Sequence, residues 1–104
     1  MDCVFCQIRD GRLLSSKVAE DDLALAIMDI NPVTAGHVLV LTKAHAETLF
    51  ETLEEDLLAA ARLAWRVAKG IRRGLAPDGL NLIQSNGRAA FQSVPHFHIH
   101  RIPR

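Results

Sequence analysis

Three histidines at alternate positions near the end of the chain carry the strongest chemical signal in the sequence. His96, His98 and His100 alternate with the apolar residues Phe97 and Ile99. Because side chains alternate across a β-strand, the pattern predicts a strand with three imidazoles on one face and an apolar packing surface on the other. Near neutral pH an imidazole can act as a nucleophile, as a general acid or base, or as a metal ligand.

The spacing of the histidines bears on which of these roles they take. Residues two apart on a strand are separated by roughly 6.5–7 Å, so three successive imidazoles do not converge easily on one ion, and at most one or two would share it. A division of labour fits the spacing better, with one nucleophile and neighbours that contact phosphate or fix its tautomer. A three-histidine zinc site is the alternative, because imidazole is a common zinc ligand.

The elements that must position these residues follow from the apolar periodicity. We expect strands within 18–28 on either side of an acidic turn at 20–22, and at 37–42, 80–84 and 94–102. Apolar residues recur at three- and four-residue steps from Leu53 to Leu75, which predicts one long helix with Thr52 and Glu55 as a capping box and Gly74 as a stop. A shorter helix is expected over 43–50. This order predicts an α+β fold with a mainly antiparallel sheet, one long helix and one short helix.

Length and charge limit the function classes. The 104 residues, 49% of them hydrophobic, fit a single domain over residues 1–104. Twelve Lys and Arg balance twelve Asp and Glu, so the basic excess of a general nucleic-acid binder is missing. No apolar run reaches the length of a membrane span, and the first residues do not form a signal peptide. We therefore expect a cytoplasmic protein without nucleic-acid or membrane partners.

The residues around the histidines resemble the signature of the histidine triad (HIT) family, in which three histidines alternate with apolar residues. The resemblance covers nearly the whole chain and is strongest to histidine triad nucleotide-binding proteins, especially bacterial ones with a C-x-x-C pair. It implies a HIT-like fold and a single HIT domain. The further motifs follow in the family's order: Cys3-x-x-Cys6, Asp29-Ile30-Asn31-Pro32, Gly36-His37, Lys43-x-His45, Asn86-Gly87 and Gln92-Ser93.

The resemblance implies a hydrolase or nucleotidyl transferase that acts at the α-phosphate of purine nucleotides of the AMP or GMP type. His98 would be the nucleophile and would form a covalent nucleotidyl-histidine, while the backbone of His96 fixes its tautomer. His100 would contact the phosphoryl oxygens, and Ser93 would assist a leaving amine, as in a purine nucleoside phosphoramidase. No magnesium is required in principle, because imidazoles and backbone amides supply the stabilisation.

The same resemblance implies a nucleotide-binding set. Asp29 would accept both ribose hydroxyls with its two oxygens, although an Asp before Asn31-Pro32 is also a common turn cap. His37 matches a family histidine close to the triad, and a structural role at a strand start is equally open. The apolar members of the set also fit a plain core. The remaining members are Phe5, Ile8, Ile27, Ile30, Asn86, Gln92, Ser93, Val94, His98 and His100.

Four residues match positions that bind structural zinc in some bacterial members of the family. A set of two cysteines and two histidines with C-x₂-C spacing suits tetrahedral zinc, and it would pin the N-terminal segment and the 43–50 stretch to the histidine strand. Two inert thiols or a redox pair are the alternatives. The residues are Cys3, Cys6, His45 and His96.

Three residues depart from the family pattern. Arg101 stands at the apolar position after His100, Phe91 replaces the small residue that usually precedes Gln92, and Thr42 replaces a common Pro. Relatives often carry a further tail after the position of Arg104, and its absence would leave the leaving-group side open. Phe91 and the missing tail give weight to one alternative, a slow or non-catalytic nucleotide-binding scaffold. Two further alternatives stay open: a dinucleoside polyphosphate hydrolase of the same family, which differs in leaving group, and a zinc-dependent interaction module in which Cys3 and Cys6 matter and His98 does not.

The nucleotide-binding branch generally forms a two-fold dimer through the long helix and the neighbouring strand. Trp65 is a large anchor of the type favoured at interfaces. Two-fold closure is the commonest form of oligomer, so we expect a homodimer. Four further helix residues are expected to add apolar surface beyond the inward stripe: Ala59, Ala60, Leu63 and Val67.

Overall fold

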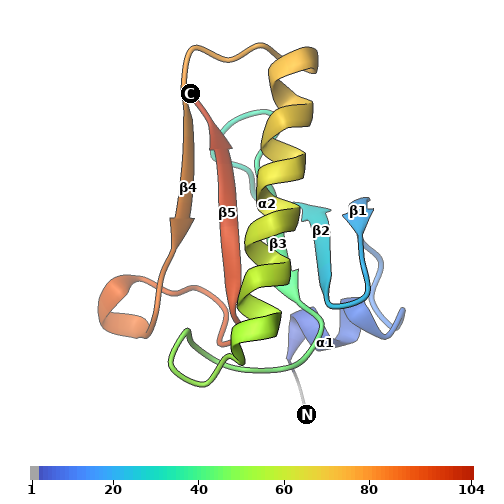
Figure 1. Cartoon of the computed structure of the whole chain (residues 1–104), viewed down its shortest axis with the longest axis vertical. Coiled ribbons are helices and arrows are strands. Elements are labelled where there is room, and N and C mark those ends of the chain that lie inside the picture. Colours follow the sequence, from blue (N-terminus) through green and yellow to red (C-terminus); the bar gives the residue numbers. More distant parts are fainter. Residues whose placement is uncertain (1–2) are drawn as a thin grey trace.

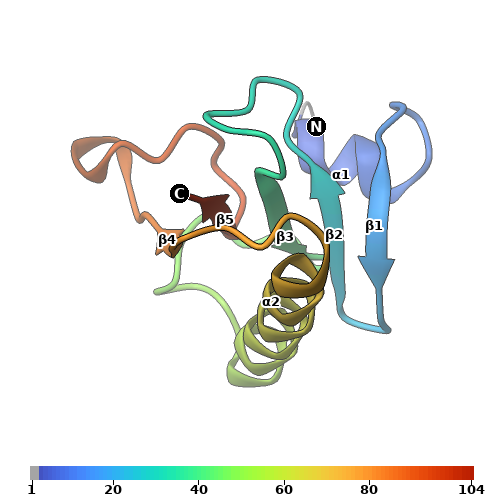
Figure 2. The ribbon, with the colours of Figure 1, turned by 90° about the horizontal axis from the view of Figure 1, so that it is seen from above.

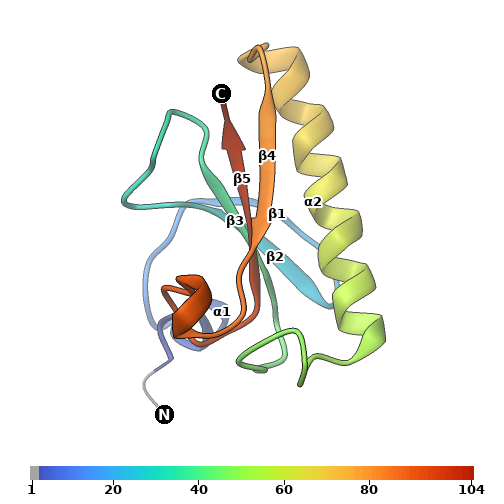
Figure 3. The same cartoon turned by 90° about the vertical axis from the view of Figure 1, so that its left-hand side faces the viewer.

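The computed structural model of the chain describes residues 3–104, which form a five-stranded antiparallel sheet between two helices of unequal length (Figure 1). The strand order is β1-β2-β3-β5-β4, and every neighbouring pair is antiparallel. The long helix α2 covers one face and the short helix α1 lies on the other (Figures 2 and 3). The predicted α+β class is confirmed. The elements are α1 (Val4–Arg9), β1 (Lys17–Glu20), β2 (Ala24–Met28), β3 (Val38–Thr42), α2 (Glu54–Gly74), β4 (Leu80–Gln84), the 3₁₀ turn η1 (Arg88–Ala90) and β5 (His98–Pro103).

The main core lies between α2 and the sheet. Val38 and Val40 of β3 face the helix, and Phe97, which is fully buried, packs in the same cluster just before β5. The central strands β2 and β3 are continuous apolar runs because both of their faces are covered. The prediction that the apolar residues between the histidines face a packing surface is therefore confirmed, because Phe97 and Ile99 pack in the core under α2.

The apolar helix residues that we expected to add dimer surface belong to this core instead. Ala60 and Leu63 are at most 1% exposed, and Ala59 and Val67 are also buried. The apolar stripe of α2 is wider than a narrow seam because the helix lies flat across β1, β2, β3 and β5. Trp65, by contrast, is 57% exposed, and its contact with a second copy of the chain stays a prediction.

The long helix is confirmed, but its predicted capping box does not form. The N-cap is Leu53, without a side-chain hydrogen bond, and the hydroxyl of Thr52 donates to the Thr48 carbonyl instead. The charges at the two ends of the helix stabilise it instead. Three acidic residues lie in the first turn and two arginines lie in the last turn, where each set interacts favourably with the helix dipole. Gly74 is the last helical residue.

Two further predictions are wrong in position. Residues 43–50 form no helix, because Thr48 and Glu51 close a local turn through their side chains. The last strand begins at His98 and not near 94, since the backbone turns at Pro95, where the amide of His96 donates to the Val94 carbonyl. The short helix lies at Val4–Arg9, where Cys3 serves as its N-cap. Within the described residues, neither helix has the length and apolar character to cross a membrane.

Candidate active site

A cleft of about 440 Å³ lies on the face of the sheet opposite α2. Its walls come from α1, the end of β2, the loop that follows β2, and the segment before β5. Eight of the residues predicted to bind a nucleotide line it: Phe5, Ile8, Ile27, Asp29, Ile30, Ser93, Val94 and His100. Sequence reasoning missed the remaining lining residues, which are Val4, Leu13, Leu14, Ser15, Met28, Asn31 and Leu39. The two adjacent leucines Leu13 and Leu14 were a signal in the sequence for some of them, and the structure shows both exposed.

Helix α1 places an aromatic wall against the histidines. The Sγ of Cys3 accepts a hydrogen bond from the amide of Cys6, which starts the helix, and Arg9 ties its end to the Lys43 carbonyl at 2.7 Å. Phe5 is thereby buried, with its ring centroid 5.1 Å from that of His98 and 5.6 Å from that of His96, in edge-on contacts. Phe5 is part of a second core cluster and also lines the cleft, so its place in the core is confirmed and its contact with a base stays a prediction.

His98 has a single tautomer in this setting. Its Nδ1 lies 2.7 Å from the carbonyl oxygen of His96. A carbonyl only accepts hydrogen bonds, so Nδ1 carries the proton and Nε2 is left with a free lone pair. Burial lowers the pKa of His98, which favours the neutral imidazole. The residue is 3% exposed and is not among the residues that line the cleft, but its ring contacts the rings of two that do, with centroids 5.1 Å from Phe5 and 4.9 Å from His100.

His100 is oriented by a chain of hydrogen bonds that begins at the backbone. The amide of Val33 donates to Nδ1 of His37 at 3.1 Å, so the proton of His37 sits on Nε2. That Nε2 is 2.9 Å from Nδ1 of His100 and 3.3 Å from a carboxylate oxygen of Asp29. His100 therefore accepts at Nδ1, and its own proton sits on Nε2, where it can be donated to a ligand. Burial lowers the pKa of His100 to about 4.

Asp29 caps the turn before Asn31-Pro32, which was one of its two predicted roles. It also lines the cleft. One carboxylate oxygen accepts from the Asn31 amide at 2.8 Å, and the other faces His37. Each carboxylate oxygen has a second lone pair, so the group can still accept from a ligand hydroxyl.

The side chains of Asn86 and Gln92 are not among the residues that line the cleft. Asn86 accepts from the Leu49 amide at 2.6 Å, and the carboxamide of Gln92 bridges Gly87 and the carbonyl of Val94. Both carboxamides hold the loop that leads to Ser93. In the structure these two side chains therefore hold the loop in place and do not line the cleft where the phosphate is predicted to bind.

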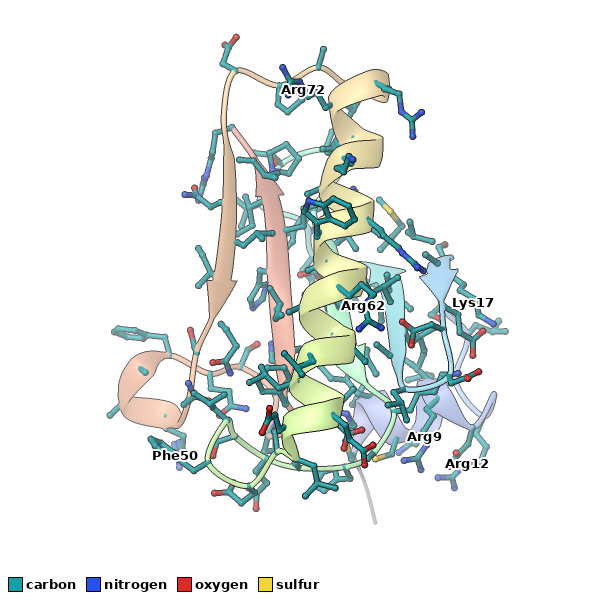
Figure 4. The ribbon with its side chains drawn as sticks, viewed as in Figure 1. Arg9, Arg12, Lys17, Phe50, Arg62 and Arg72 are labelled. Atoms are coloured by element: carbon teal, nitrogen blue, oxygen red, sulfur yellow. The ribbon has the colours of Figure 1, made fainter. Side chains whose placement is uncertain are left out.

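The backbone conformation at Phe91 explains why relatives usually have a small residue at this position. The φ of Phe91 is 66°, in the left-handed region where a Cβ is unfavourable, and its side chain is 90% exposed. Phe50, also exposed, lies on the neighbouring loop beside η1 (Figure 4). Phe91 does not line the cleft, so it does not narrow it.

A second cluster of polar side chains lies beside His98 and brings together the four predicted metal ligands. The ligand atoms of Cys3, Cys6, His45 and His96 all lie within 4.8 Å of one another. The Nδ1 atoms of His45 and His96 are 3.3 Å apart, and the Sγ atoms lie 3.3–3.6 Å from an Nδ1. Tetrahedral zinc with ordinary bond lengths separates two nitrogens by about 3.3 Å and a sulfur from a nitrogen by about 3.6 Å.

The chemistry of this donor set also fits a metal. Nε2 of His96 lies 2.6 Å from the Thr42 carbonyl, so it carries the proton and Nδ1 turns a lone pair toward the cluster. Burial lowers the pKa of His96 to about 4, and a neutral imidazole is the form that binds zinc. The carbonyl that orients His96 is the outer contact typical of zinc-bound histidines.

The chain is similar to characterised and uncharacterised proteins across nearly its whole length. It is 43% identical over 103 residues to Protein hit of Bacillus subtilis, covering 99% of this chain and 71% of that protein. It is 40% identical to adenosine 5′-monophosphoramidase hnt1 of Schizosaccharomyces pombe, covering 100% and 75%. It is 41% identical to adenylylsulfatase HINT3 of Arabidopsis thaliana, covering 99% and 52%.

Solved structures agree with these similarities. A HIT family protein from Bacillus anthracis superposes with a TM-score of 0.96 at 43% identity, covering 99% of this chain and 73% of that one. A zinc-bound histidine triad family protein from Mycobacterium smegmatis superposes with a TM-score of 0.95 at 42% identity, covering 100% and 76%. The HIT domain family matches residues 11–104. The chain is therefore a member of the HIT family.

Proposed function

We propose that the protein hydrolyses purine nucleoside phosphoramidates through a covalent intermediate on His98. The observation that carries the proposal is the fixed tautomer of His98, which leaves Nε2 free beside a cleft with apolar walls and a carboxylate. The names of the fission yeast and Arabidopsis relatives support hydrolysis at a nucleotide phosphate, and the leaving group differs between them.

The proposed reaction has two displacement steps. Nε2 of His98 attacks the α-phosphorus, the P–N bond to the leaving group breaks, and the amine departs after it takes a proton, with Ser93 as the donor that relays it. Water then attacks the phosphorus, the bond from phosphorus to His98 breaks, and the nucleoside monophosphate leaves with the oxygen of that water. The proton that the water loses returns to Ser93 and replaces the one given to the amine. His98 returns to its neutral form. The sum is phosphoramidate plus water giving nucleotide and amine.

The described residues support a placement for each part of the substrate. The base would lie between Phe5, Ile8 and Ile27, with Ile30 at the open rim, and the ribose hydroxyls would reach Asp29. The α-phosphoryl oxygens would accept from Nε2–H of His100 and from backbone amides near Val94. We propose that no magnesium is required, because these donors meet the charge that develops on the phosphoryl group. Rates with and without added magnesium should then be equal.

Single-turnover hydrolysis of adenosine 5′-phosphoramidate tests the proposal. A reaction quenched early and examined by intact mass should show one adenylyl group on the protein, and later samples should show free AMP in its place. Binding of AMP without an adduct and without turnover would favour the alternative of a nucleotide-binding scaffold. Faster turnover of a dinucleoside polyphosphate than of the phosphoramidate would favour the other alternative.

We expect His37→Ala to lower kcat by about 10²-fold, the scale for losing one oriented hydrogen bond in catalysis. His37 acts through His100, because its Nε2–H holds Nδ1 of His100 and so keeps the reactive proton on the other nitrogen. The affinity for AMP should change much less than kcat. His37→Gln retains a donor and should recover part of the rate. Equal losses in both variants, or a loss confined to KM, would contradict this positioning role.

We propose that the protein forms a homodimer through α2 and β4. The strand β4 lies at an edge of the sheet, and four of its five residues are exposed, among them Leu80 and Leu82. An exposed apolar edge strand and an exposed tryptophan on α2 are both stabilised when a second copy of the chain covers them. Light scattering should give twice the mass of the chain at micromolar concentration. Trp65→Ser should weaken the dimer, and Val18→Ser, at an exposed apolar residue of β1 on the opposite edge of the sheet, should not. A monomeric mass for the unaltered chain would contradict the proposal.

We also propose zinc as a resident structural ion of the second cluster, held by Cys3, Cys6, His45 and His96. When bound, it supplies a crosslink between the N-terminus, the segment after β3 and the segment before β5. Thiolate ligands are kept in a reducing compartment, so we propose a cytoplasmic location, with a nucleotide and no nucleic acid or membrane as the partner.

A further inference from the structure

Arg101 is a buried cation that the proposed reaction does not use. It follows His100 on β5, so its side chain lies on the opposite face of the sheet, under α2. It is 7% exposed, although the family pattern has an apolar residue at this position. Its guanidinium donates to the carbonyls of Val67 on α2 and Gly36 before β3, at 2.6 and 2.8 Å.

The charge of Arg101 lacks an anionic partner among residues 3–104. A guanidinium has five N–H groups, and two of them are used by these carbonyls, while Nε has no hydrogen-bond partner at all. No described carboxylate forms an ion pair with it. Burial without a counter-charge lowers the pKa of Arg101. A buried charge of this kind is costly unless an anion pairs with it.

A groove of about 630 Å³ adjoins this guanidinium, on the far side of the sheet from the active-site cleft. It runs between α2 and the β1–β2 edge, and Leu63, Gly70 and Ile71 are among its apolar walls. Arg66 supplies a second cation. The one acidic residue in the lining is Glu20, whose two oxygens are held by Lys17 and Lys43 at 2.7 and 2.6 Å. The groove is therefore apolar along its length and positive at Arg101 and Arg66.

The glycines of the groove show which parts of it are open. A Cβ at Gly70 would meet nothing within 4 Å, so this stretch of α2 leaves space above the sheet. At Gly36 the φ is +87°, and a Cβ would lie 2.7 Å from Cδ1 of Leu75, which closes the end of the groove. The volume is in the range of small-molecule sites.

We propose that this groove binds a small organic acid, with one carboxylate at Arg101 and Arg66 and an aliphatic chain or ring along Leu63, Gly70 and Ile71. A carboxylate matches the planar donors of a guanidinium and neutralises the buried charge, while the apolar walls recognise the rest of the molecule. The inference does not depend on the reaction at His98, since it rests on residues of the other face.

Titration with octanoate tests the site, using the zinc-loaded full chain and backbone amide chemical shifts as the readout. We expect saturable shifts centred on Gly36, Val67 and Gly70, and a rise in melting temperature. Octanol and octylamine should bind at least about tenfold more weakly, because they lack the carboxylate. Equal binding of octanol would overturn recognition of the charge, and binding of acetate or inorganic phosphate as tight as that of octanoate would overturn the apolar part.

Matched variants separate binding from folding. Gly70→Leu fills the open stretch and favours the helix, so it should raise stability and still reduce octanoate binding at least about tenfold, whereas Gly70→Ala should bind normally. Arg66→Met should weaken binding, and Arg62→Met, on the same helix and outside the groove lining (Figure 4), should not. Arg101→Met should abolish it. Shifts that remain unchanged in Gly70→Leu and Arg66→Met would place octanoate elsewhere and overturn the proposal.

Discussion

His98→Ala should abolish both the adenylyl adduct and the release of AMP, with a loss in kcat/KM on the order of 10⁴-fold or more, the scale of removing a catalytic nucleophile. The reason is specific to one atom. Nε2 of His98 has a free lone pair beside the cleft, because Nδ1 carries the proton and donates it to the His96 carbonyl. His100 cannot replace it, since Nδ1 of His100 is occupied by His37 and its Nε2 carries a proton. Intact mass and an AMP assay provide the two measurements.

Binding provides the control for this variant. The cleft lining contains Phe5, Ile27 and Asp29 and does not include His98, so AMP should still bind to His98→Ala within a few-fold of the unaltered affinity. The His98→Gly variant with added imidazole is a second check, because a free imidazole can occupy the space and restore part of the turnover. Full activity of His98→Ala would remove the covalent mechanism. Loss of AMP binding together with activity would show that His98 supports the cleft and would leave its chemistry undecided.

The sequence predicted most of the elements because their apolar patterns report burial directly. β3 and α2 were readily predicted. The residues of β3 form an uninterrupted apolar run covered on both faces, and the apolar residues of α2 recur at helical spacing along a wide stripe. The ends were harder. Thr52 and Glu55 have the spacing of a capping box, yet the hydroxyl of Thr52 donates to the Thr48 carbonyl. The conformation of the preceding turn determines this contact, and the two residues alone do not predict it.

The errors at 43–50 and at the start of β5 have two physical causes each: a local turn, between Thr48 and Glu51 and at Pro95, and contacts from far along the chain. Both segments are held by long-range contacts: the Phe97 amide donates to the Ala46 carbonyl, and His45 meets His96 and Cys6. Local propensity carries no information on such pairings. The same holds for Asn86 and Gln92, whose amide groups suit a phosphate contact in isolation but are engaged by neighbouring loops.

The role of His37 could not be read from its position in the chain. A histidine at a strand start has an ordinary structural reading, and the sequence does not place it beside a particular partner. Only the pairing of β3 with β5, with Leu39 opposite His100, brings it within hydrogen-bond distance of that residue. The alternation of the triad, by comparison, was visible because it is a property of consecutive residues.

Loss of the proposed zinc ligand Cys3 should have a large effect on stability. Cys3→Ser should lower the zinc content from about one ion per chain to near zero, measured by elemental analysis, and should lower the melting temperature by more than about 10 °C. A structural zinc site contributes its binding free energy to folding, and in a domain of this size about 1 kcal/mol corresponds to roughly 4–8 °C. The cluster adds a crosslink among three segments that otherwise meet through hydrogen bonds such as those from Arg9 to the Lys43 carbonyl and from the Phe97 amide to the Ala46 carbonyl, so its loss weakens the attachment of all three.

Serine is the informative replacement at this position. The Sγ of Cys3 also accepts from the Cys6 amide as the N-cap of α1, and a serine hydroxyl is at least as good a cap. A drop in stability in Cys3→Ser therefore reports the metal and not the helix start. Excess chelator should bring the unaltered chain down to the melting temperature of Cys3→Ser and should leave the variant where it is. An unaltered chain that resists chelator and melts together with the variant would show that the cluster holds no stabilising ion.

The same variant separates a structural ion from one that takes part in the reaction. The ring of His96 keeps its hydrogen bond to the Thr42 carbonyl without a metal, and the carbonyl that fixes His98 belongs to the same residue's backbone. Below its melting temperature, Cys3→Ser should therefore retain kcat within about tenfold of the unaltered chain, a small loss beside that expected for His98→Ala. A loss in kcat as large as that of His98→Ala, in a variant that is still folded, would mean that the cluster does more than hold the N-terminal segment against the sheet.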